Sequence, residues 1–171
     1  MKKKKETIQF KRKREKKTNY KKRLKILLAQ KPRLVIRPSL KNMTAQLIEY
    51  HPKGDITIIS ADSKELEKLG WKFNKGNVPS AYLTGLLIGK KAKEKSIKEA
   101  ILDTGLCSLT KGSRIYACLK GAVDAGLDIP CSEDIFPEES RIKGEHISSY
   151  RKIEDFSKEF DSIKNKILKV K

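Results

Sequence analysis

Three short stretches between residues 32 and 61 carry the apolar and β-branched patterns that predict strands. Residues 32–38 (PRLVIRP) hold a β-branched run between two prolines, which mark strand ends because proline cannot donate to a ladder. Residues 43–50 roughly alternate between apolar and polar, as in a strand with one face in water. Residues 55–61 are more apolar, which favours a central strand. Since turn sequences separate the three stretches, they predict an antiparallel meander.

Helical spacing of apolar residues begins after the meander. Residues 63–70 predict a short helix that ends at a glycine. A longer helix is expected over residues 80–95, because Pro79 suits a first helical turn. Within it, Gly85 and Gly89 are expected to allow close approach to the sheet.

The second half of the chain is less regular. Residues 97–103 predict a fourth strand, and residues 111–125 predict a helix with one apolar stripe. Residues 127–149 show no periodicity, which predicts a long loop. Residues 148–170 predict one amphipathic helix from apolar side chains at steps of three or four: Ile153, Phe156, Phe160, Ile163, Ile167 and Val170. Its apolar face is expected to dock on its own core, which short connections favour, or on a neighbouring protein.

Together these elements predict an α/β fold. A mixed, largely antiparallel sheet carries helices mainly on one face, preceded by a basic extended arm and followed by a C-terminal helix. The domain organisation expected is an arm over residues 1–25, an α/β sandwich core over 26–130, and an irregular loop with the amphipathic helix over 131–171.

Charge is concentrated in the arm. Residues 1–25 hold fourteen Lys or Arg against two acids, about +12 of the net +19 of the 171-residue chain. The few apolar residues of this arm cannot bury enough surface to offset the entropy lost when such a charged segment becomes ordered. The arm is therefore expected to become ordered on a polyanion. Phosphate is the obvious one, because each neutralised phosphate releases condensed counterions. The alternatives are a disordered solubilising tail or a localisation address.

Other classes of protein find little support in the composition. No run of 18 apolar residues predicts a membrane span, and no apolar stretch follows the basic start as in a signal peptide. The three cysteines, Cys107, Cys118 and Cys131, contain no CxxC pair, which argues against zinc and against a disulfide framework. All three are expected to be buried small apolar residues, in an intracellular, soluble protein.

Acidic residues at strand ends leave one catalytic hypothesis open. A two-metal nuclease site needs carboxylates that converge on shared ions. Asp103 in ILDTG is the best single candidate, although aspartates before glycine often cap turns instead. Neither His51 nor His146 has a nucleophilic partner at a recognisable spacing. The acids available are Asp55, Asp62, Asp103 and Asp124.

Basic residues of the first strand extend the charged surface. Arg33 and Arg37 lie four apart in a strand, so they share one face, which is expected to be in water. Lys41 and Asn42 follow in the next turn. Beside the arm, this face predicts RNA contact; an ordinary wet sheet face is the alternative.

Aromatic residues interleave with the cations of the arm. Tyr20 and Phe10 are able to stack on unpaired bases. The alternative for Tyr20 is packing on Leu24 where the arm joins the core.

Four stretches then resemble a known family: residues 11–50, GNVPSAYLTGLLIGKKA, EAILDTGLCSLTKGSRIYACLKGAVDAGLDIPCSEDIFP and RIKGEHISSY. They are similar to the archaeal and eukaryotic form of the universal 5S ribosomal RNA binder, the eighteenth protein in large-subunit numbering. The resemblance covers about residues 10 to 150. Residues 1–9 are more lysine-rich than the matching part of the family, and the last twenty residues carry no clear motif.

The resemblance implies a mixed α/β sandwich with a basic extension and a non-enzymatic role in the cytoplasmic ribosome. The implied role is to bind 5S rRNA and anchor it in the central protuberance, without a metal or other cofactor. The implied partners are 5S rRNA, large-subunit rRNA and neighbouring ribosomal proteins there, with no membrane. The alternative is a metal-dependent RNA-processing nuclease that depends on Asp55 and Asp103. The RNA-contacting residues implied are Arg12, Lys13, Arg14, Lys16, Lys17, Thr18, Asn19, Tyr20, Lys22, Arg23, Arg33, Arg37, Ser39, Lys41 and Asn42.

Overall fold

The computed structural model describes residues 7–153 and 155–169. The first six residues of the predicted arm, and Val170 of the predicted C-terminal stripe, lie outside this described part. A four-stranded sheet in the order β3-β2-β1-β4 forms the centre of the molecule. Its strands are β1 (Arg33–Pro38), β2 (Met43–Glu49), β3 (Ile56–Asp62) and β4 (Ile101–Asp103).

The predicted meander is confirmed, but β3 is an edge strand and not the central strand expected from its apolar residues. Strands β1 and β2 pair antiparallel, as do β2 and β3, whereas β4 pairs parallel with β1. The sheet is therefore mixed and largely antiparallel, as the sequence indicated. The fourth strand is shorter than predicted, because residues 97–100 leave the sheet and Glu99 forms only an isolated bridge with Asp128.

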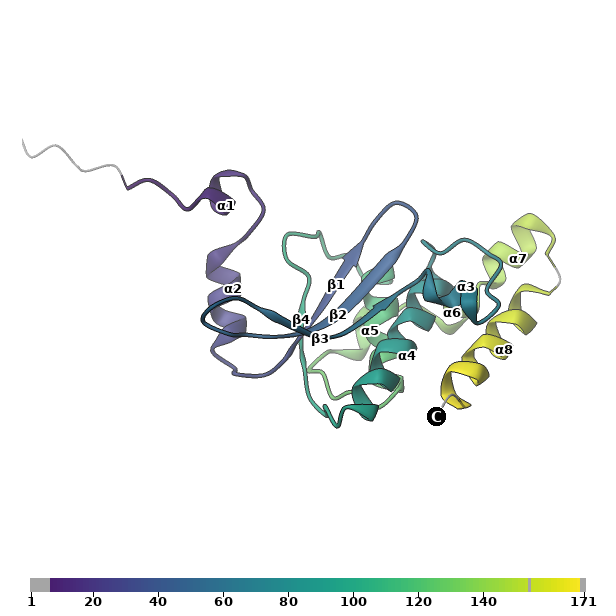
Figure 1. The fold of residues 1–171 in the computed structure, drawn as a ribbon. Helices are drawn as coiled ribbons and strands as arrows, with labels where there is room; N and C mark the ends of the chain where they lie inside the picture. The colour runs from purple at the N-terminus through teal and green to yellow at the C-terminus, as the bar shows by residue number, and fades with distance from the viewer. Residues whose placement is uncertain (1–6, 154, 170–171) are drawn as a thin grey trace, which may run out of the picture.

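Helices lie on both sides of this sheet, in layers that Figure 1 shows edge-on. Helix α2 lies on one side, α4 and α5 lie on the other, and α8 packs outside α4. The elements besides the sheet are α1 (Lys11–Arg14), α2 (Tyr20–Leu27), α3 (Glu65–Lys68), α4 (Val78–Glu94), α5 (Arg114–Asp124), a 3-10 turn (Glu133–Ile135), α6 (Glu139–Lys143), α7 (Glu145–Arg151) and α8 (Phe156–Lys169).

Helix α4 is the central element of the core. Asn77 caps its start by accepting a hydrogen bond from the Ser80 backbone N–H at 2.9 Å. Gly85 allows close approach as predicted, but to α5 and not to the sheet. A Cβ atom at this position would lie 1.9 Å from the Cys118 carbonyl oxygen. The backbones of α4 and α5 therefore touch at this glycine.

The C-terminal region differs from its prediction. Residues 127–149 are not one long loop, because α6, most of α7 and the 3-10 turn lie within them. The single helix expected over 148–170 is broken at Lys152, whose left-handed backbone (φ 52°) ends α7. These short helices escaped prediction because one or two turns are too few to show a periodicity.

Docking of the C-terminal helix on its own core is confirmed. Phe156 and Phe160 are fully or almost fully buried, with Ile163 and Ile167 behind them. The Phe156 ring lies 4.5 Å from Phe73, centroid to centroid. Helix α8 is thereby part of the hydrophobic core.

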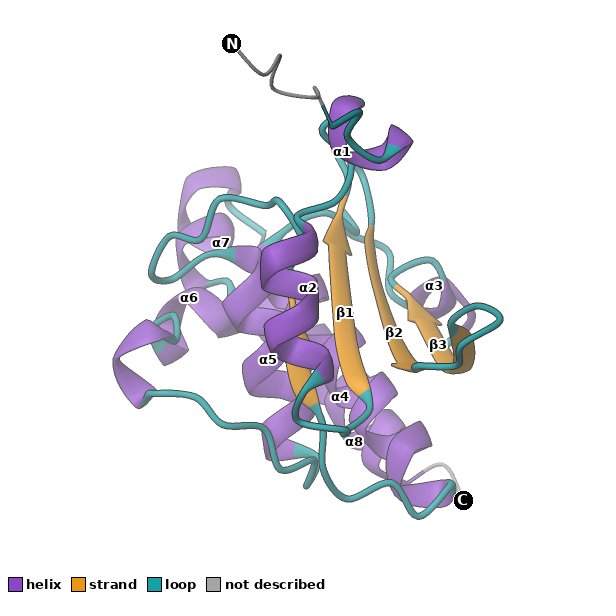
Figure 2. Cartoon of the chain, turned by 90° about the vertical axis from the view of Figure 1, so that its left-hand side faces the viewer, coloured by secondary structure: helices purple, strands orange, loops and turns teal. Residues whose placement is uncertain are grey.

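The arm is not extended throughout. Its described part folds into α1 and α2, and Figure 2 shows α2 in front of the sheet beside β1. Helix α2 also continues past residue 25 to Leu27. The prediction for the cysteines is right for Cys118 alone, since Cys107 is half-buried and Cys131 exposed. No helix within residues 7–153 and 155–169 is long and apolar enough to cross a membrane.

Candidate nucleic-acid interface

Helix α2 begins at a well-formed cap. The Asn19 side chain accepts a hydrogen bond from the Lys22 backbone N–H at 3.1 Å, which satisfies one of the free donors of the first turn. The helix sequence, YKKRLKIL, carries Lys21, Lys22, Arg23 and Lys25. All eight of its residues, each within the described part of the chain, are half-buried or exposed. Polar contacts therefore add to the half-buried Tyr20, Ile26 and Leu27 in holding α2 to the sheet.

The strongest of these contacts is an ion cluster under the helix. The Arg23 guanidinium donates to both carboxylate oxygens of Asp55, at 2.8 and 2.9 Å. Asp55 also accepts from Arg33 on β1 at 2.7 Å, and Arg33 donates in turn to Asp103 on β4 at 2.9 Å. The cluster joins α2, the turn before β3, β1 and β4.

The charges of this cluster shift one another's proton affinities. Burial alone would raise the pKa of Asp55, but the hydrogen bonds from Arg23 and Arg33 outweigh it, so its pKa lies below the ordinary value. The Asp55 hydrogen bond raises the pKa of Arg23. Both groups are therefore held in their charged forms.

Arg33 corrects a prediction made from strand periodicity. Arg33 and Arg37 do share a face, but Arg33 is only 2 % exposed, because α2 and the Asp55 turn cover it. The expectation of a solvent-facing Arg33 is wrong. Arg37 remains exposed, donating to the Ile36 and Asp103 carbonyl oxygens, both at 3.0 Å.

A second attachment is made by Lys22, the residue before Arg23. The Lys22 ammonium donates to the Thr104 hydroxyl at 3.0 Å and to the Gly105 carbonyl at 3.4 Å. Gly105 adopts a left-handed backbone (φ 60°), and its N–H donates to Asp103 Oδ1 at 2.8 Å. The loop after β4 therefore presents acceptors to α2.

Between α1, α2 and the sheet lies a hollow of about 260 Å³. Six cationic side chains and two carboxylates line it, and both carboxylates are paired with Arg33. An anion that enters the hollow therefore meets an excess of positive charge. The lining residues are Arg12, Lys17, Thr18, Asn19, Lys22, Arg23, Arg33, Val35, Arg37, Ile48, Asp55, Asp103 and Gly105.

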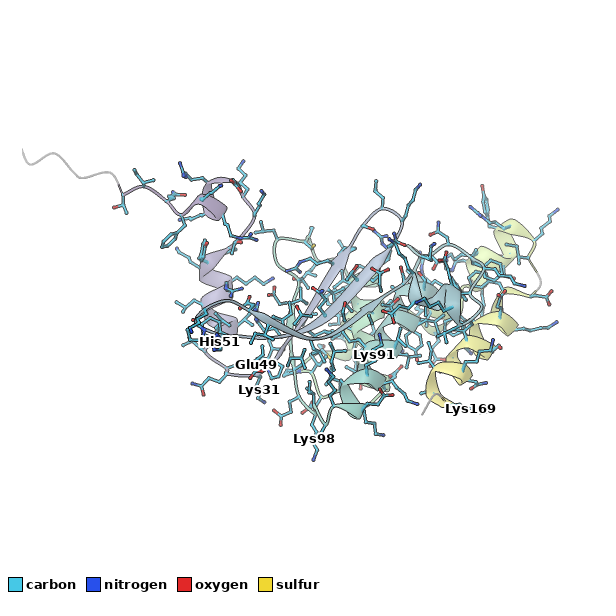
Figure 3. The ribbon with its side chains drawn as sticks, viewed as in Figure 1. Lys31, Glu49, His51, Lys91, Lys98 and Lys169 are labelled. Atoms are coloured by element: carbon cyan, nitrogen blue, oxygen red, sulfur yellow. The ribbon has the colours of Figure 1, made fainter. Side chains whose placement is uncertain are left out.

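Helix α1 stands clear of the sheet, with side chains that project into open space (Figure 3). Arg12 is tied to Thr18 by a hydrogen bond of 2.9 Å from its Nε. The Tyr20 ring is half-buried, and the ring of Phe10 lies 5.2 Å from it between centroids. Three cations of this region, Lys13, Arg14 and Lys16, are exposed.

The β1–β2 turn lies at the end of the sheet toward which β1 points (Figure 2). Ser39 Oγ accepts from the Asn42 N–H at 2.9 Å, and the Ser39 carbonyl accepts from Arg114 at 3.2 Å. Ser39 and Asn42 thus shape the turn, while Lys41 is exposed. The turn therefore carries an exposed cation.

The sequence matches the family described as ribosomal large-subunit proteins 60S L5 and 50S L18, over residues 4–99 and 90–132. These stretches make up more than half of the chain. The protein belongs to this family. It is a large-subunit ribosomal protein that binds 5S rRNA, as the resemblance in the sequence indicated.

In this ribosomal protein the acids considered for a nuclease are engaged with other groups. Asp55 and Asp103 do come together, but around the Arg33 guanidinium. Asp62 accepts from Thr44 at 2.7 Å, and Asp124 accepts from Tyr82 at 2.7 Å. Within residues 7–153 and 155–169, no three His, Cys, Asp or Glu side chains gather as a metal site would require.

Of the residues expected to contact RNA, eight line the hollow: Arg12, Lys17, Thr18, Asn19, Lys22, Arg23, Arg33 and Arg37. The others are Lys13, Arg14 and Lys16 near α1, Tyr20 on α2, and Ser39, Lys41 and Asn42 in the hairpin turn. Sequence reasoning missed the roles of Asp55 and Asp103 in holding α2. It also missed α2 itself, for which Asn19 before an amphipathic KKRLKILL run was an available signal.

Proposed function

We propose that this protein anchors 5S rRNA in the central protuberance of the cytoplasmic ribosome and also contacts the large-subunit rRNA. The observation that carries the proposal is the cationic hollow between α1, α2 and the sheet. Six cations line it against two carboxylates, and both carboxylates are paired with Arg33. Lys17 also pairs with Glu15 and Arg37 lies 3.8 Å from Asp103, so positive charge remains in excess. Backbone phosphates are the ligands that such a surface attracts, because their neutralisation releases counterions.

The expected RNA-contacting residues divide by position into two groups. Lys22, Arg23 and Arg33 make contacts within the protein, so in our proposal they orient the surface. The exposed cations Lys13, Arg14, Lys16, Lys17, Arg37 and Lys41 contact phosphates. Phosphate contacts of this kind fix the position of the RNA and do not read its sequence.

The aromatic pair at the edge of the hollow adds a second kind of contact. Phe10 is 72 % exposed, and the Tyr20 ring against it is half-buried. We propose that the pair stacks on an unpaired base of the RNA, which contributes about 1–3 kcal/mol per base.

The proposed domain roles follow the predicted boundaries. Residues 1–25 contact RNA, residues 26–130 form the scaffold, and residues 131–171 face neighbouring ribosomal proteins. Support for the last role comes from α7, whose Tyr150 is exposed, while the apolar face of α8 is used within the protein.

The test compares the full chain with a variant that lacks residues 1–18 and so retains the Asn19 cap of α2. This deletion removes ten Lys or Arg. If the full chain makes about 6–10 phosphate contacts, its affinity for 5S rRNA falls roughly 10³- to 10⁵-fold between about 50 and 200 mM salt. The truncated chain is expected to show a shallower slope. An equal slope in both chains contradicts the proposed role of the arm.

A further inference from the structure

Asp55 occupies an unusual position for an acid in a protein that binds a polyanion. It lies in the turn between β2 and β3, beside the surface proposed to meet RNA phosphates. Its two oxygens accept three hydrogen bonds, from Arg23 of α2 and Arg33 of β1, at 2.7 to 2.9 Å. Electrostatics alone makes such a carboxylate unfavourable for RNA binding, so its contacts within the protein require an explanation.

The helix that Asp55 contacts has little else to hold it. None of the residues of α2, which the structure describes in full, is buried, and Leu24 on it is 62 % exposed. An isolated helix of eight residues is too short to be stable in water. Besides its half-buried apolar side chains, α2 is held to the sheet by the contacts of Arg23 with Asp55 and of Lys22 with the loop after β4.

Arg33 makes the attachment point rigid. Its guanidinium is buried between Asp55 and Asp103, so these contacts tie Asp55 to β1 and β4 independently of Arg23. Arg23 contacts this carboxylate through one nitrogen, Nη2, which lies within hydrogen-bond distance of both Asp55 oxygens. Asp55 thus offers α2 one defined place on the sheet.

We propose that Asp55 is a positioning residue that holds α2 on the sheet in the RNA-free protein, so that the cations of α1 and α2 are arranged before RNA binds. This inference rests on the proposed function of the hollow. When only a fraction of the protein is in the binding form, the apparent affinity falls by that fraction. Loss of the Asp55 carboxylate therefore weakens RNA binding, although it makes the protein more positive.

The experiment uses the full chain with Asp55→Asn and, as a matched control, Glu49→Gln. Glu49 is an exposed acid at the end of β2, near His51 of the same turn (Figure 3), so its substitution changes the net charge equally. Two quantities are measured: hydrogen exchange at residues 20–27 without RNA, and affinity for 5S rRNA. Asp55→Asn is expected to speed exchange and to weaken binding about three- to tenfold. Glu49→Gln is expected to leave exchange unchanged and binding equal or slightly tighter.

A second pair of variants separates positioning from stability, because Asp55→Asn also removes one partner of the buried Arg33. Arg23→Gln leaves the Asp55–Arg33–Asp103 contacts in place, and Lys21→Gln removes an equal charge from an exposed site on α2. We expect Arg23→Gln to reproduce the fast exchange and Lys21→Gln not to do so. Asp55→Glu, which retains the charge, is expected to restore part of the affinity.

Two outcomes overturn the inference. One is binding by Asp55→Asn as tight as by the unaltered protein, and the other is weaker binding with unchanged exchange at α2. Failure of the unaltered protein to bind RNA through the hollow is a different result, because it contradicts the proposed function. The exchange measurement without RNA still shows in that case whether Asp55 holds α2 on the sheet.

Discussion

Helices α2 and α8 rest on the same α/β core, but opposite kinds of contact hold them there. Helix α8 buries Phe156, Phe160, Ile163 and Ile167. Helix α2, described over its whole length, buries no side chain and is held by its hydrogen bonds and ion pairs. The first kind of contact is nearly indifferent to salt and pH, whereas the second depends on both.

This difference matches what each helix faces. An apolar interface suits a helix that never leaves the core, because its burial is strongly favourable. A polar interface leaves the cations of α2 accessible to phosphate, which competes for the same kinds of contact. The buried apolar contacts of α8 thus lie on one side of the sheet, and the cationic surface around α2 lies on the other.

The largest effect is expected from the apolar contact. Phe156 packs against both Trp71 and Phe73, at 5.5 and 4.5 Å between ring centroids. Phe156→Ala is expected to lower the free energy of unfolding by about 3–5 kcal/mol, from lost burial and the cavity left behind. Asn165→Ala, on the outward face of α8, is the control and is expected to change it by less than about 0.5 kcal/mol. Denaturant unfolding measures the free energy of unfolding of both variants. A decrease of less than about 1 kcal/mol for Phe156→Ala contradicts the conclusion that apolar burial holds α8.

Acid is expected to act on α2 before α8. The lowered pKa of Asp55 means that its contribution to docking is complete above the ordinary carboxylate value of about 3.9 and is lost as pH falls through its folded pKa. The charged groups around it are Arg23, Arg33 and, beyond Arg33, Asp103. Hydrogen exchange at residues 20–27 is therefore expected to be constant from about pH 5 to 8, after correction for intrinsic rates, and to rise below about pH 4.

Asp55→Asn supplies the control for this pH dependence. With no carboxylate at position 55, α2 is expected to exchange quickly at neutral pH and to show a weaker response to acid. Protection of α2 that persists at about pH 3 in the unaltered protein shows that other contacts hold the helix.

The smallest effect is expected from salt on the RNA-free protein. The Arg23–Asp55 pair is about one-third exposed at each side chain, so added salt screens it in part. Raising salt from about 0.05 to 1 M is expected to speed exchange at α2 about two- to fivefold, which corresponds to a partly exposed pair. Helix α8, measured in the same sample, is expected to be unaffected. Equal responses of the two helices contradict the distinction drawn between them.

The sequence was most informative where local pattern and tertiary contact agree. The prolines around residues 33–37 and the alternation after Met43 place β1 and β2 correctly, because their apolar residues face one core. The stripe from Phe156 to Ile167 likewise predicted docking on the core. Strand β4 was predicted too long, since its extent depends on parallel pairing with β1 and not on its own residues.

The candidate interface was only partly predictable. Six of the ten cations expected to contact RNA line the hollow, and their contact with RNA stays a prediction. The pairing of Arg23 with Asp55, 32 residues later, leaves no periodic signal in one sequence. For the same reason Arg33 was expected in water, although Asp103 and Asp55 meet it from two other elements. Ion pairs between residues far apart in the sequence could therefore not be predicted from residue spacing.

The aromatic residues that contact α8 are synthesised before α8 itself. Trp71, Phe73 and Tyr82 are synthesised well before Phe156 and Phe160, which cover them. At about 5–20 residues per second, more than 70 further residues take several seconds to add to the nascent chain. Throughout that interval the growing chain lacks the helix that covers these aromatic rings. Protection of these rings from other chains is therefore a requirement of biosynthesis, and it ends only when the last helix folds onto them.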